Sequence, residues 1–288
     1  MLAIIVNPLA GGIKKMAKNI ALVEARLKEL NVEYKFYKTE TPKHATLLTK
    51  QAISEGATTI VAMGGDGTLS ETINGLDNFD KITFGLIPCG TGNDFATHLN
   101  LPLDPVKALD LILNTPATYI DFMQLQGVRG INIVGMGIDV EILKLYSKLK
   151  KKTKMGYYNC LLRTLCTYKC KKFDTIIEDE RTSQTAFIAC VANGSMFGGG
   201  IVMSPDAKSD DGKLDFVCVD EIKGLKIIPA LLKLNGGKIL KLKQSKFRHV
   251  ERISVESDYP ITVNVDGELH DDIPFDVQIV SNTLKMHK

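Results

Sequence analysis

The chain has 288 residues, enough for two domains, and its 44% hydrophobic and 24% charged residues are typical of a soluble globular protein with a full core. A net charge of +3 is too small to indicate a nucleic-acid-binding protein, and no run of about 18 apolar residues is present to span a membrane. The six cysteines form no Cys-x-x-Cys pair, and the start MLAIIVNP lacks the basic lead of a secretory signal. We therefore expect reduced thiols in a cytoplasmic protein without a signal peptide or transmembrane segment.

The first third of the chain alternates short apolar runs with helical patterns. Strands are expected at residues 2–6, 32–39, 58–63 and 84–88. Apolar residues recur at helical spacing over 16–30, and a second helix fits 43–55. Strands separated by helices of this length predict βαβ units, and hence a doubly wound α/β domain up to about residue 120.

From Ile120 onward, strand-like segments dominate the sequence. They cover residues 130–136, 172–179, 185–193, 214–220, 251–257, 260–266 and 276–281. Turn sequences such as DDGK and VDGE between them are typical of an antiparallel sheet. We predict an α/β domain over 1–122, joined by about residues 281–288, and a β-rich, sandwich-like domain over 123–280 with a helical basic insertion at 139–172. A crevice between two such domains is a common setting for an active site, and we expect the site there.

The sequence VAMGGDGTLSETING joins a buried strand to a helical pattern. Gly64, Gly65 and Gly67 let backbone N–H groups approach a ligand, and a helix beginning near Thr68 offers unpaired N–H groups to an anion. Asp66 repels bare phosphate unless a divalent cation lies between them, so the loop indicates a nucleotide with Mg²⁺. Taken alone, the loop fits equally well a tight turn in which Asp66 caps the helix.

Two further glycine turns follow predicted strands of the same sheet. They are NPLAGG at residues 7–12 and PCGTGNDFA at residues 88–96. Glycine, threonine and aspartate thus recur at one sheet edge, which favours a shared ligand site over unrelated turns. The chain has neither a Gly-x-x-x-x-Gly-Lys-[Ser/Thr] loop nor a Gly-x-Gly-x-x-Gly sequence after the first strand. Walker-type and dinucleotide-binding proteins are therefore disfavoured.

The motifs GGDGT (64–68), NP…GG (7–12) and GTGNDF (90–95) together resemble the diacylglycerol kinase catalytic domain. They are most similar to the soluble bacterial lipid kinases of that superfamily, which also contains sphingosine and ceramide kinases. The resemblance extends to SPDAKSDDGKLD (204–215) and VNVDGE (263–268), and so covers nearly the whole chain. GGDGT alone is shared with NAD kinases and, as a variant, with 6-phosphofructokinases, whereas its combination with GTGNDF and Asp-Gly-Glu is much more specific.

The resemblance implies a role for each matching residue in the first domain. Its ATP-contacting positions fall on Asn7, Pro8, Thr39, Gly64, Gly65, Asp66, Gly67, Thr68 and Thr91. It also places Asp66 and Asp94 near the catalytic Mg²⁺.

In the second domain the resemblance assigns two roles that spacing alone does not. Glu268 matches the general base of the family, and Asp211 matches a ligand of a structural Mg²⁺, with the carbonyls of Lys208 and Lys213 as weaker matches. By spacing alone, Glu268 is an exposed hairpin carboxylate and Asp211 a turn residue, because Asp-Gly is a strong hairpin signal.

The insertion is strongly basic. Between Lys144 and Lys172 the chain has ten basic residues and no acidic one, interleaved with apolar and aromatic residues. A cationic amphipathic segment suits an anionic bilayer surface, whereas a solvated helix face and an RNA-binding patch are the alternatives. The residues expected to dock on the membrane are Lys148, Lys150, Lys151, Lys152 and Lys154.

The residues and the resemblance together predict an ATP- and Mg²⁺-dependent lipid kinase, with diacylglycerol as substrate and phosphatidic acid as product. The expected partner is a lipid at an anionic membrane surface, bound transiently, with no nucleic acid and with a homodimer as a candidate assembly. An NAD kinase is the first alternative, but GTGNDFA stands where that family carries Asn-Glu. A non-catalytic nucleotide- or lipid-binding regulator of the same fold is the second.

Overall fold

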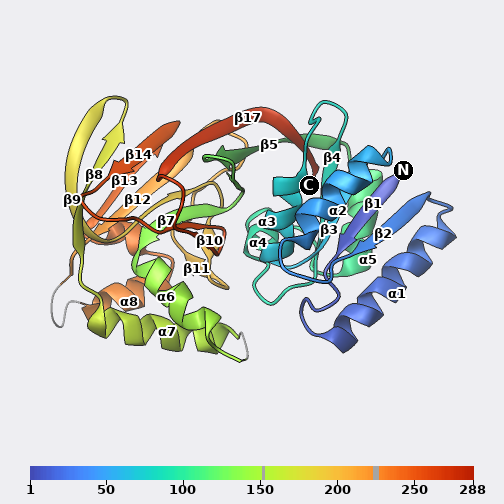
Figure 1. Cartoon of the computed structure of the whole chain (residues 1–288). Helices are drawn as coiled ribbons and strands as arrows, with labels where there is room; N and C mark the ends of the chain where they lie inside the picture. Colours follow the sequence, from blue (N-terminus) through green and yellow to red (C-terminus); the bar gives the residue numbers. More distant parts are fainter. Residues whose placement is uncertain (151–152, 223–226) are drawn as a thin grey trace. The chain divides into compact units, whose positions relative to one another are not determined.

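The computed structural model describes residues 1–150, 153–222 and 227–288 (Figure 1). The chain divides into two compact units: Met1–Asp121 with Ser281–Lys288, and Phe122–Val280. No helix in these ranges is long and apolar enough to cross a membrane.

The first unit alternates strands and helices around a parallel sheet. Its elements are β1 (Leu2–Val6), α1 (Ile13–Glu29), β2 (Tyr34–Lys38), α2 (His44–Ser54), β3 (Thr59–Gly64), α3 (Asp66–Gly75), β4 (Thr83–Pro88), α4 (Asp94–His98) and α5 (Pro105–Asn114). The parallel strands lie in the order β2-β1-β3-β4, and the end of β17 (Asp276–His287) extends the sheet beside β4, where Lys285 pairs with Thr83. The α/β class and the parallel sheet predicted from the sequence are confirmed.

Helices cover the sheet of the first unit because its strands are apolar on both faces. Ile4 and Val6 of β1 pack with Met16 of α1 and Leu109 of α5 on one face. Helix α2 packs closely against α3, and a Cβ atom on Gly75 would lie only 2.5 Å from the Thr46 carbonyl oxygen. The sequence therefore builds a rigid layer whose strand ends present the glycine turns.

The second unit is rich in antiparallel strands. Strand β5 (Ala117–Gln124) leads into it, followed by β6 (Arg129–Gly130), β7 (Ile133–Gly137), α6 (Ile138–Ser147), α7 (Lys154–Thr167), β8 (Lys171–Ile177), β9 (Glu180–Ala192), β10 (Met196–Phe197), β11 (Ile201–Val202), β12 (Leu214–Asp220), α8 (Ile227–Asn235), the 3₁₀ helix η2 (Ile239–Lys241), β13 (Ser245–Val250), β14 (Arg252–Glu256), β15 (Val263–Val265) and β16 (Glu268–His270). The long strand β9 pairs with β7, β8 and β12, while β15 joins β7 to β16.

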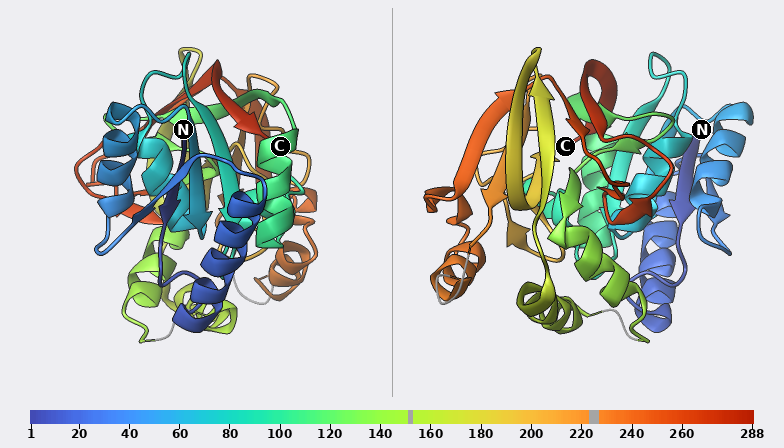
Figure 2. Two further views of the ribbon diagram at one scale, coloured as in Figure 1. Left: turned by 90° about the vertical axis from the view of Figure 1, so that its right-hand side faces the viewer. Right: turned by 60° about the vertical axis from the view of Figure 1, so that its left-hand side comes forward.

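Alternating side chains give the second unit two separate cores. Val134 and Val191 face one core, which is enclosed by strands, whereas Ile133 and Val217 face the other. Helices α6, α7 and α8 cover this second face, as the views in Figures 1 and 2 agree in showing. Burial on both faces explains why the strands read as continuous apolar runs.

The structure also differs from the sequence prediction in three places. The basic insertion consists of α6 and α7 and ends before Lys171, where β8 already begins. Helix α8 was not predicted. The Asp-Gly turn at Asp211 joins no hairpin, because β12 pairs with β9 and β13 while β11 pairs with β10.

Candidate active site

Three glycine turns meet at one edge of the sheet in the first unit. A Cβ atom on Gly11 would lie 2.2 Å from the Cys89 carbonyl oxygen, and a Cβ atom on Gly90 would lie 2.4 Å from the Gly65 Cα atom. The Cys89 N–H donates to the Gly64 carbonyl oxygen at 2.6 Å. The turns after β1, β3 and β4 therefore touch backbone to backbone, which only glycine allows.

The remaining candidate ATP contacts of the first unit lie at the ends of neighbouring strands. Asn7 follows β1, and its Oδ1 accepts the Leu9 N–H at 3.0 Å beside the half-buried Pro8. Thr39 follows β2 and donates its N–H to the Val6 carbonyl oxygen at 2.8 Å. The carboxyl ends of parallel strands are where such sheets bind ligands.

Asp66 fastens one glycine turn to the next. It is the first residue of α3, and the N-cap is Gly65, which offers no side chain. The helix begins two residues before Thr68, near which it was predicted to start, whereas the alternative that Asp66 caps its own helix is wrong. Instead, the two Asp66 carboxylate oxygens accept the N–H groups of Asn93 and Asp94, each at 2.8 Å, and so cap the short helix α4. Burial raises the pKa of Asp66, and these backbone N–H groups oppose that rise.

Asp66 and Asp94 face the same small volume. A Cβ atom on Gly92 would lie 2.7 Å from Asp66 Oδ2 and 3.6 Å from Asp94 Oδ2, so the glycine leaves a space bordered by both carboxylates. Carboxylate oxygens are the ligands that Mg²⁺ prefers. Among the described residues no group of three or more acidic, His or Cys side chains forms a fuller metal site, so the remaining ligands would be water and nucleotide phosphates.

Asn93 shapes the turn that carries Thr91, although the sequence analysis gave it no role. It adopts a left-handed backbone conformation with a φ of 54°. Its side chain accepts the Gly90 N–H at 2.8 Å and donates to the Gly90 carbonyl oxygen at 3.1 Å. Thr91 is thereby held exposed at the tip of a rigid turn. Asparagine directly after Gly92 is the signal that could have predicted this conformation, because asparagine adopts left-handed backbone angles more readily than most residues.

The loop expected to bind a structural Mg²⁺ provides one side-chain ligand. Asp211 is exposed, and its Oδ1 accepts the Lys213 N–H at 3.1 Å. Lys208 and Lys213 are also exposed, so their carbonyl groups belong to a solvated loop. A cation there would depend on carbonyl groups and water in addition to one carboxylate, and this metal site stays a prediction.

Glu268 begins the second strand of a tight hairpin. Val265 pairs with Glu268, and the two loop residues Asp266 and Gly267 have φ values of 49° and 93°, as in a type I′ turn. Glu268 is half-buried rather than a fully exposed hairpin residue.

Asp266 ties this hairpin to the start of β7. Its carboxylate accepts three backbone N–H groups, from Ile131 at 2.7 Å and from Asn132 and Ile133 at 2.9 Å each. Hydrogen bonds from backbone amides to a carboxylate are among the strong ones in proteins. The residue before Gly267 therefore fixes the turn that carries Glu268.

A second attachment runs through Asn264 to Asp139. Asn264 Oδ1 accepts the Gly267 N–H at 2.9 Å, and Asn264 Nδ2 donates to Asp139 Oδ2 at 2.9 Å. Asp139 is 2% exposed, and within the described ranges its Oδ1 has no hydrogen-bond partner. Burial raises the pKa of Asp139 to about 6, against the opposing effect of Asn264 and of the amides of Val140 and Asp139.

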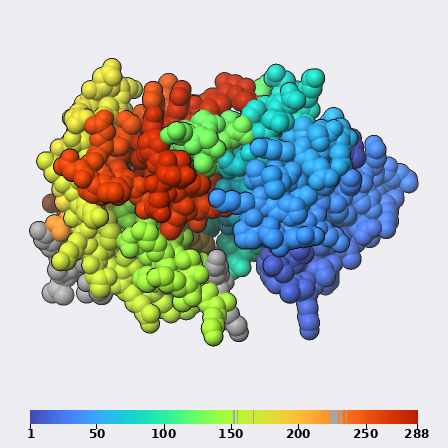
Figure 3. All heavy atoms as spheres, viewed as in Figure 1, coloured from blue at the N-terminus to red at the C-terminus, as the bar shows by residue number. Residues whose placement is uncertain are grey.

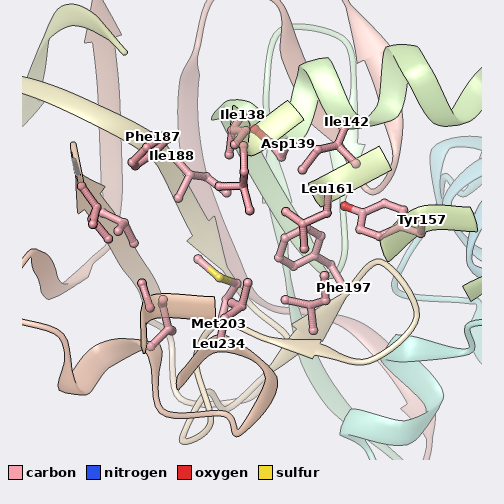
Figure 4. A pocket seen from close by; sticks show the side chains of 16 residues that line it. Ile138, Asp139, Ile142, Tyr157, Leu161, Phe187, Ile188, Phe197, Met203 and Leu234 are labelled. Atoms are coloured by element: carbon pink, nitrogen blue, oxygen red, sulfur yellow. The ribbon is translucent and has the colours of Figure 1, made fainter. Parts of the chain in front are cut away.

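Asp139 lines an apolar cavity of about 80 Å³ between the sheet and helices α6, α7 and α8 (Figure 4). Apart from this carboxylate, the lining side chains are aliphatic, aromatic or methionine, among them Ile138, Tyr157, Leu161 and Met203. The accessible surface of the cavity is apolar, which suits a largely apolar ligand.

Sequence reasoning missed Asp139, Asn264 and Asp266. The signal for Asp139 was its place after a buried strand that ends in glycine, which repeats the pattern of Asp66. Asn264 stands out as a polar residue inside an apolar strand, and polar residues buried there usually bind a specific partner.

The basic insertion presents a mixed surface. Lys148 and Lys150 are exposed, α7 begins at Lys154, and Lys151 and Lys152 lie outside the described residues. On α7, Met155 is 70% and Leu162 is 50% exposed. They are seven residues apart and therefore share one face of the helix. This yellow-green segment contributes to the surface of its unit in Figure 3.

Comparisons with known proteins cover both units. Residues 1–125 match the family model of the diacylglycerol kinase catalytic domain, and residues 132–288 match that of the YegS C-terminal NAD kinase beta sandwich-like domain. A probable YegS-like lipid kinase of Xanthomonas euvesicatoria is 32% identical over 252 residues, which cover 82% of this chain and 81% of the relative. A diacylglycerol kinase of Staphylococcus saprophyticus is 28% identical over 94% of this chain and 90% of its own length. The crystal structure of a candidate diacylglycerol kinase from Bacillus anthracis has a TM-score of 0.81 and 25% identity, and the match covers 99% of this chain and 96% of that one.

Proposed function

Because the chain belongs to the diacylglycerol kinase catalytic-domain family of lipid kinases, we propose that it transfers the γ-phosphate of ATP to the hydroxyl of diacylglycerol, giving phosphatidic acid. The observation that carries the proposal for the lipid is the apolar cavity whose single carboxylate, Asp139, is joined through Asn264 to the residue before Glu268. The NAD-kinase alternative rested on the GGDGT loop alone, and the family match instead places the chain with lipid kinases.

In this proposal the three glycine turns bind the nucleotide. Helix α3 starts at Asp66 without a side-chain cap, so the N–H groups of its first turn are available to phosphate oxygens. Gly67 has no heavy atom within 4 Å of a Cβ position, which leaves room for a phosphate beside the backbone. Asn7, Thr39 and Thr91 would contact the rest of the nucleotide.

Asp66 and Asp94 would hold Mg²⁺ beside the phosphates. When bound, the ion neutralises the negative charge that develops on the transferring phosphoryl group. Asp66 orients Asp94 by capping α4, so one residue both binds and positions. The second predicted Mg²⁺, at Asp211, would brace the loop of the second unit and takes no part in the transfer.

Glu268 would accept the proton of the attacking lipid hydroxyl. A carboxylate serves as general base when it lies within hydrogen-bond reach of that proton, and the two anchors of the turn fix where Glu268 stands. The cavity beside Asp139 would take hydrocarbon of the substrate. Its volume of about 80 Å³ is roughly half that of a cavity known to hold benzene, so it accommodates a short stretch of chain as it stands.

We further propose that the enzyme works in the cytoplasm and docks transiently on anionic membranes through the basic insertion. Lys148 and Lys150 would bind acidic headgroups, and each cation near such a surface contributes about 1 kcal/mol. The exposed Met155 and Leu162 would enter the interface, since an amphipathic helix buries its apolar face there.

The test is transfer of label from γ-labelled ATP, with Mg²⁺, to mixed anionic micelles that each carry one candidate lipid, with NAD as a soluble control. Label in phosphatidic acid supports the proposal, label in another lipid replaces the substrate, and label in NAD alone refutes a lipid acceptor. Glu268→Gln should lower kcat by about 100-fold or more, because a positioned general base contributes that much or more to the rate. Full activity of this variant would refute the assigned base.

A further inference from the structure

Asn264 is a polar residue in the middle of β15, a buried strand whose other residues are valines. It is 3% exposed, and its strand neighbours Val263 and Val265 are buried in an apolar core. Each end of its side-chain amide is used once, by the Gly267 N–H and by Asp139 Oδ2. Burying an amide is unfavourable unless both ends are bonded, so these two bonds account for the residue.

The two partners of Asn264 belong to different parts of the proposed reaction. Asp139 lines the apolar cavity at the start of α6, whereas Gly267 immediately precedes Glu268 in the hairpin turn. The path from cavity to turn therefore consists of two hydrogen bonds of 2.9 Å each and a single side chain.

Residues 131–139, which are bonded to both Asp266 and Asn264 of the hairpin, form a rigid segment. Asp266 binds the amides of Ile131, Asn132 and Ile133, at or just before the start of β7, and β7 leads through Gly137 into α6. Gly137 has a φ of 110°, and a Cβ atom there would lie 2.4 Å from the Phe187 carbonyl oxygen. A shift of the α6 start is therefore transmitted to the turn rather than absorbed at the junction between β7 and α6.

We infer that Asn264 is a positioning residue that couples the carboxylate in the apolar cavity to the turn that places Glu268. The inference rests on the proposed function, which makes Glu268 the proton acceptor and the cavity the hydrocarbon site. Because Asp139 is 2% exposed, water does not compete for its bond to Asn264, and Asn264 in turn holds the Gly267 amide. The turn that carries Glu268 is thereby tied to the wall of the cavity, and its position depends on this one amide.

The variants follow from the chemistry of the pair. Asn264→Ala removes both bonds. Asn264→Asp keeps an acceptor for the Gly267 N–H but sets two carboxyl groups against each other, and the double variant Asp139→Asn with Asn264→Asp exchanges amide and carboxylate and restores both bonds. Gln184→Ala is the matched control, because Gln184 is also a buried amide of this unit but bonds to Thr175 and Lys246.

We expect Asn264→Ala to lower kcat on the order of 100-fold while the KM for ATP changes less than about twofold, because a small misplacement of a catalytic group has an effect of that size. Activity of Asn264→Asp should fall as pH rises, since the two carboxyl groups must share a proton. The double variant should recover both the rate and the wild-type pH profile, and Gln184→Ala should keep the rate. Hydrogen exchange at the Gly267 amide, measured without substrate, should be fast in Asn264→Ala and slow again in the double variant.

Unchanged kcat in Asn264→Ala, or a folded double variant that fails to recover the rate, would overturn the inference. Glu268→Gln is measured in parallel. If that variant is inactive while Asn264→Ala is fully active, the coupling is wrong and the base assignment stands. If Glu268→Gln is fully active, the proposed base itself is wrong, whatever the exchange at Gly267 shows.

Discussion

The buried carboxylate of Asp139 should make the stability of the protein depend on pH in a way that Asp139→Asn removes. The pKa of this group is about 6 in the folded protein, against an ordinary value of 3.8. Between these values the folded state binds more protons than the unfolded state. The favourable contribution of the protonated group is therefore complete below pH 3.8 and is lost as pH rises through 6.

The size of the effect follows from the two pKa values. They differ by roughly two units, and each unit corresponds to about 1.4 kcal/mol, so ionised Asp139 lowers the free energy of unfolding by about 3 kcal/mol above pH 6. Asp139→Asn carries no such charge, and its amide oxygen can still accept the Asn264 bond. The free energy of unfolding of the variant minus that of the wild type should therefore rise by about 2 kcal/mol from pH 4 to pH 7.5, because part of the effect is already present at pH 4.

The assay is urea unfolding at several pH values, followed by circular dichroism and by tyrosine fluorescence, since the chain has no tryptophan. The quantity compared is the pH dependence, because the absolute stability of the variant also contains the effect of its new amide. Asp80→Asn, at an exposed position, is the control and should follow the wild-type curve. A constant difference between Asp139→Asn and wild type across this range would refute the placement of an ionisable carboxyl group in an apolar cavity.

Three further predictions concern the glycine turns, the hairpin anchor and the docking face. Gly90→Ala should destabilise the protein in the absence of ligand, because its Cβ atom would lie 2.4 Å from the Gly65 Cα atom. Gly67→Ala should keep the melting temperature, because its Cβ atom would have no heavy atom within 4 Å, but it should weaken ATP binding measured by calorimetry. Equal behaviour of the two variants would contradict a shared phosphate site. Asp266→Ala should lower the free energy of unfolding by about 3 kcal/mol, because three backbone N–H groups lose their acceptor, and a loss below 1 kcal/mol in urea titrations would show that water replaces it. Replacing the exposed Met155 and Leu162 by glutamate should reduce sedimentation with anionic vesicles and leave phosphorylation of lipid in detergent micelles unchanged; undiminished sedimentation would refute this docking face.

The sequence by itself determined the local parts of this protein. Strand β3 and the turn at Gly64 and Gly65 follow from a buried apolar run that ends in glycines, a signal carried by adjacent residues. The repeat of that pattern at Gly90 predicted a common sheet edge, because parallel strands present their carboxyl ends together. Glu268 in the Asp-Gly-Glu turn was found by resemblance, and its role as base stays a prediction.

Only the tertiary structure decided which side chains these local parts bind. From the sequence, one interpretation had Asp66 capping the helix that follows it, but its carboxylate accepts the amides of Asn93 and Asp94 in another turn. Asn264 and Asp139 are 125 residues apart, and no short-range pattern links an amide in a strand to a carboxylate at the start of a helix. The spacing of apolar residues along a strand or helix depends on neighbours in the sequence, so the strands and glycine turns could be predicted from it. The hydrogen-bond partner of a buried polar group depends on which residues the fold brings beside it. The bond between Asp139 and Asn264, and through it the link to the turn of Glu268, could therefore not be predicted.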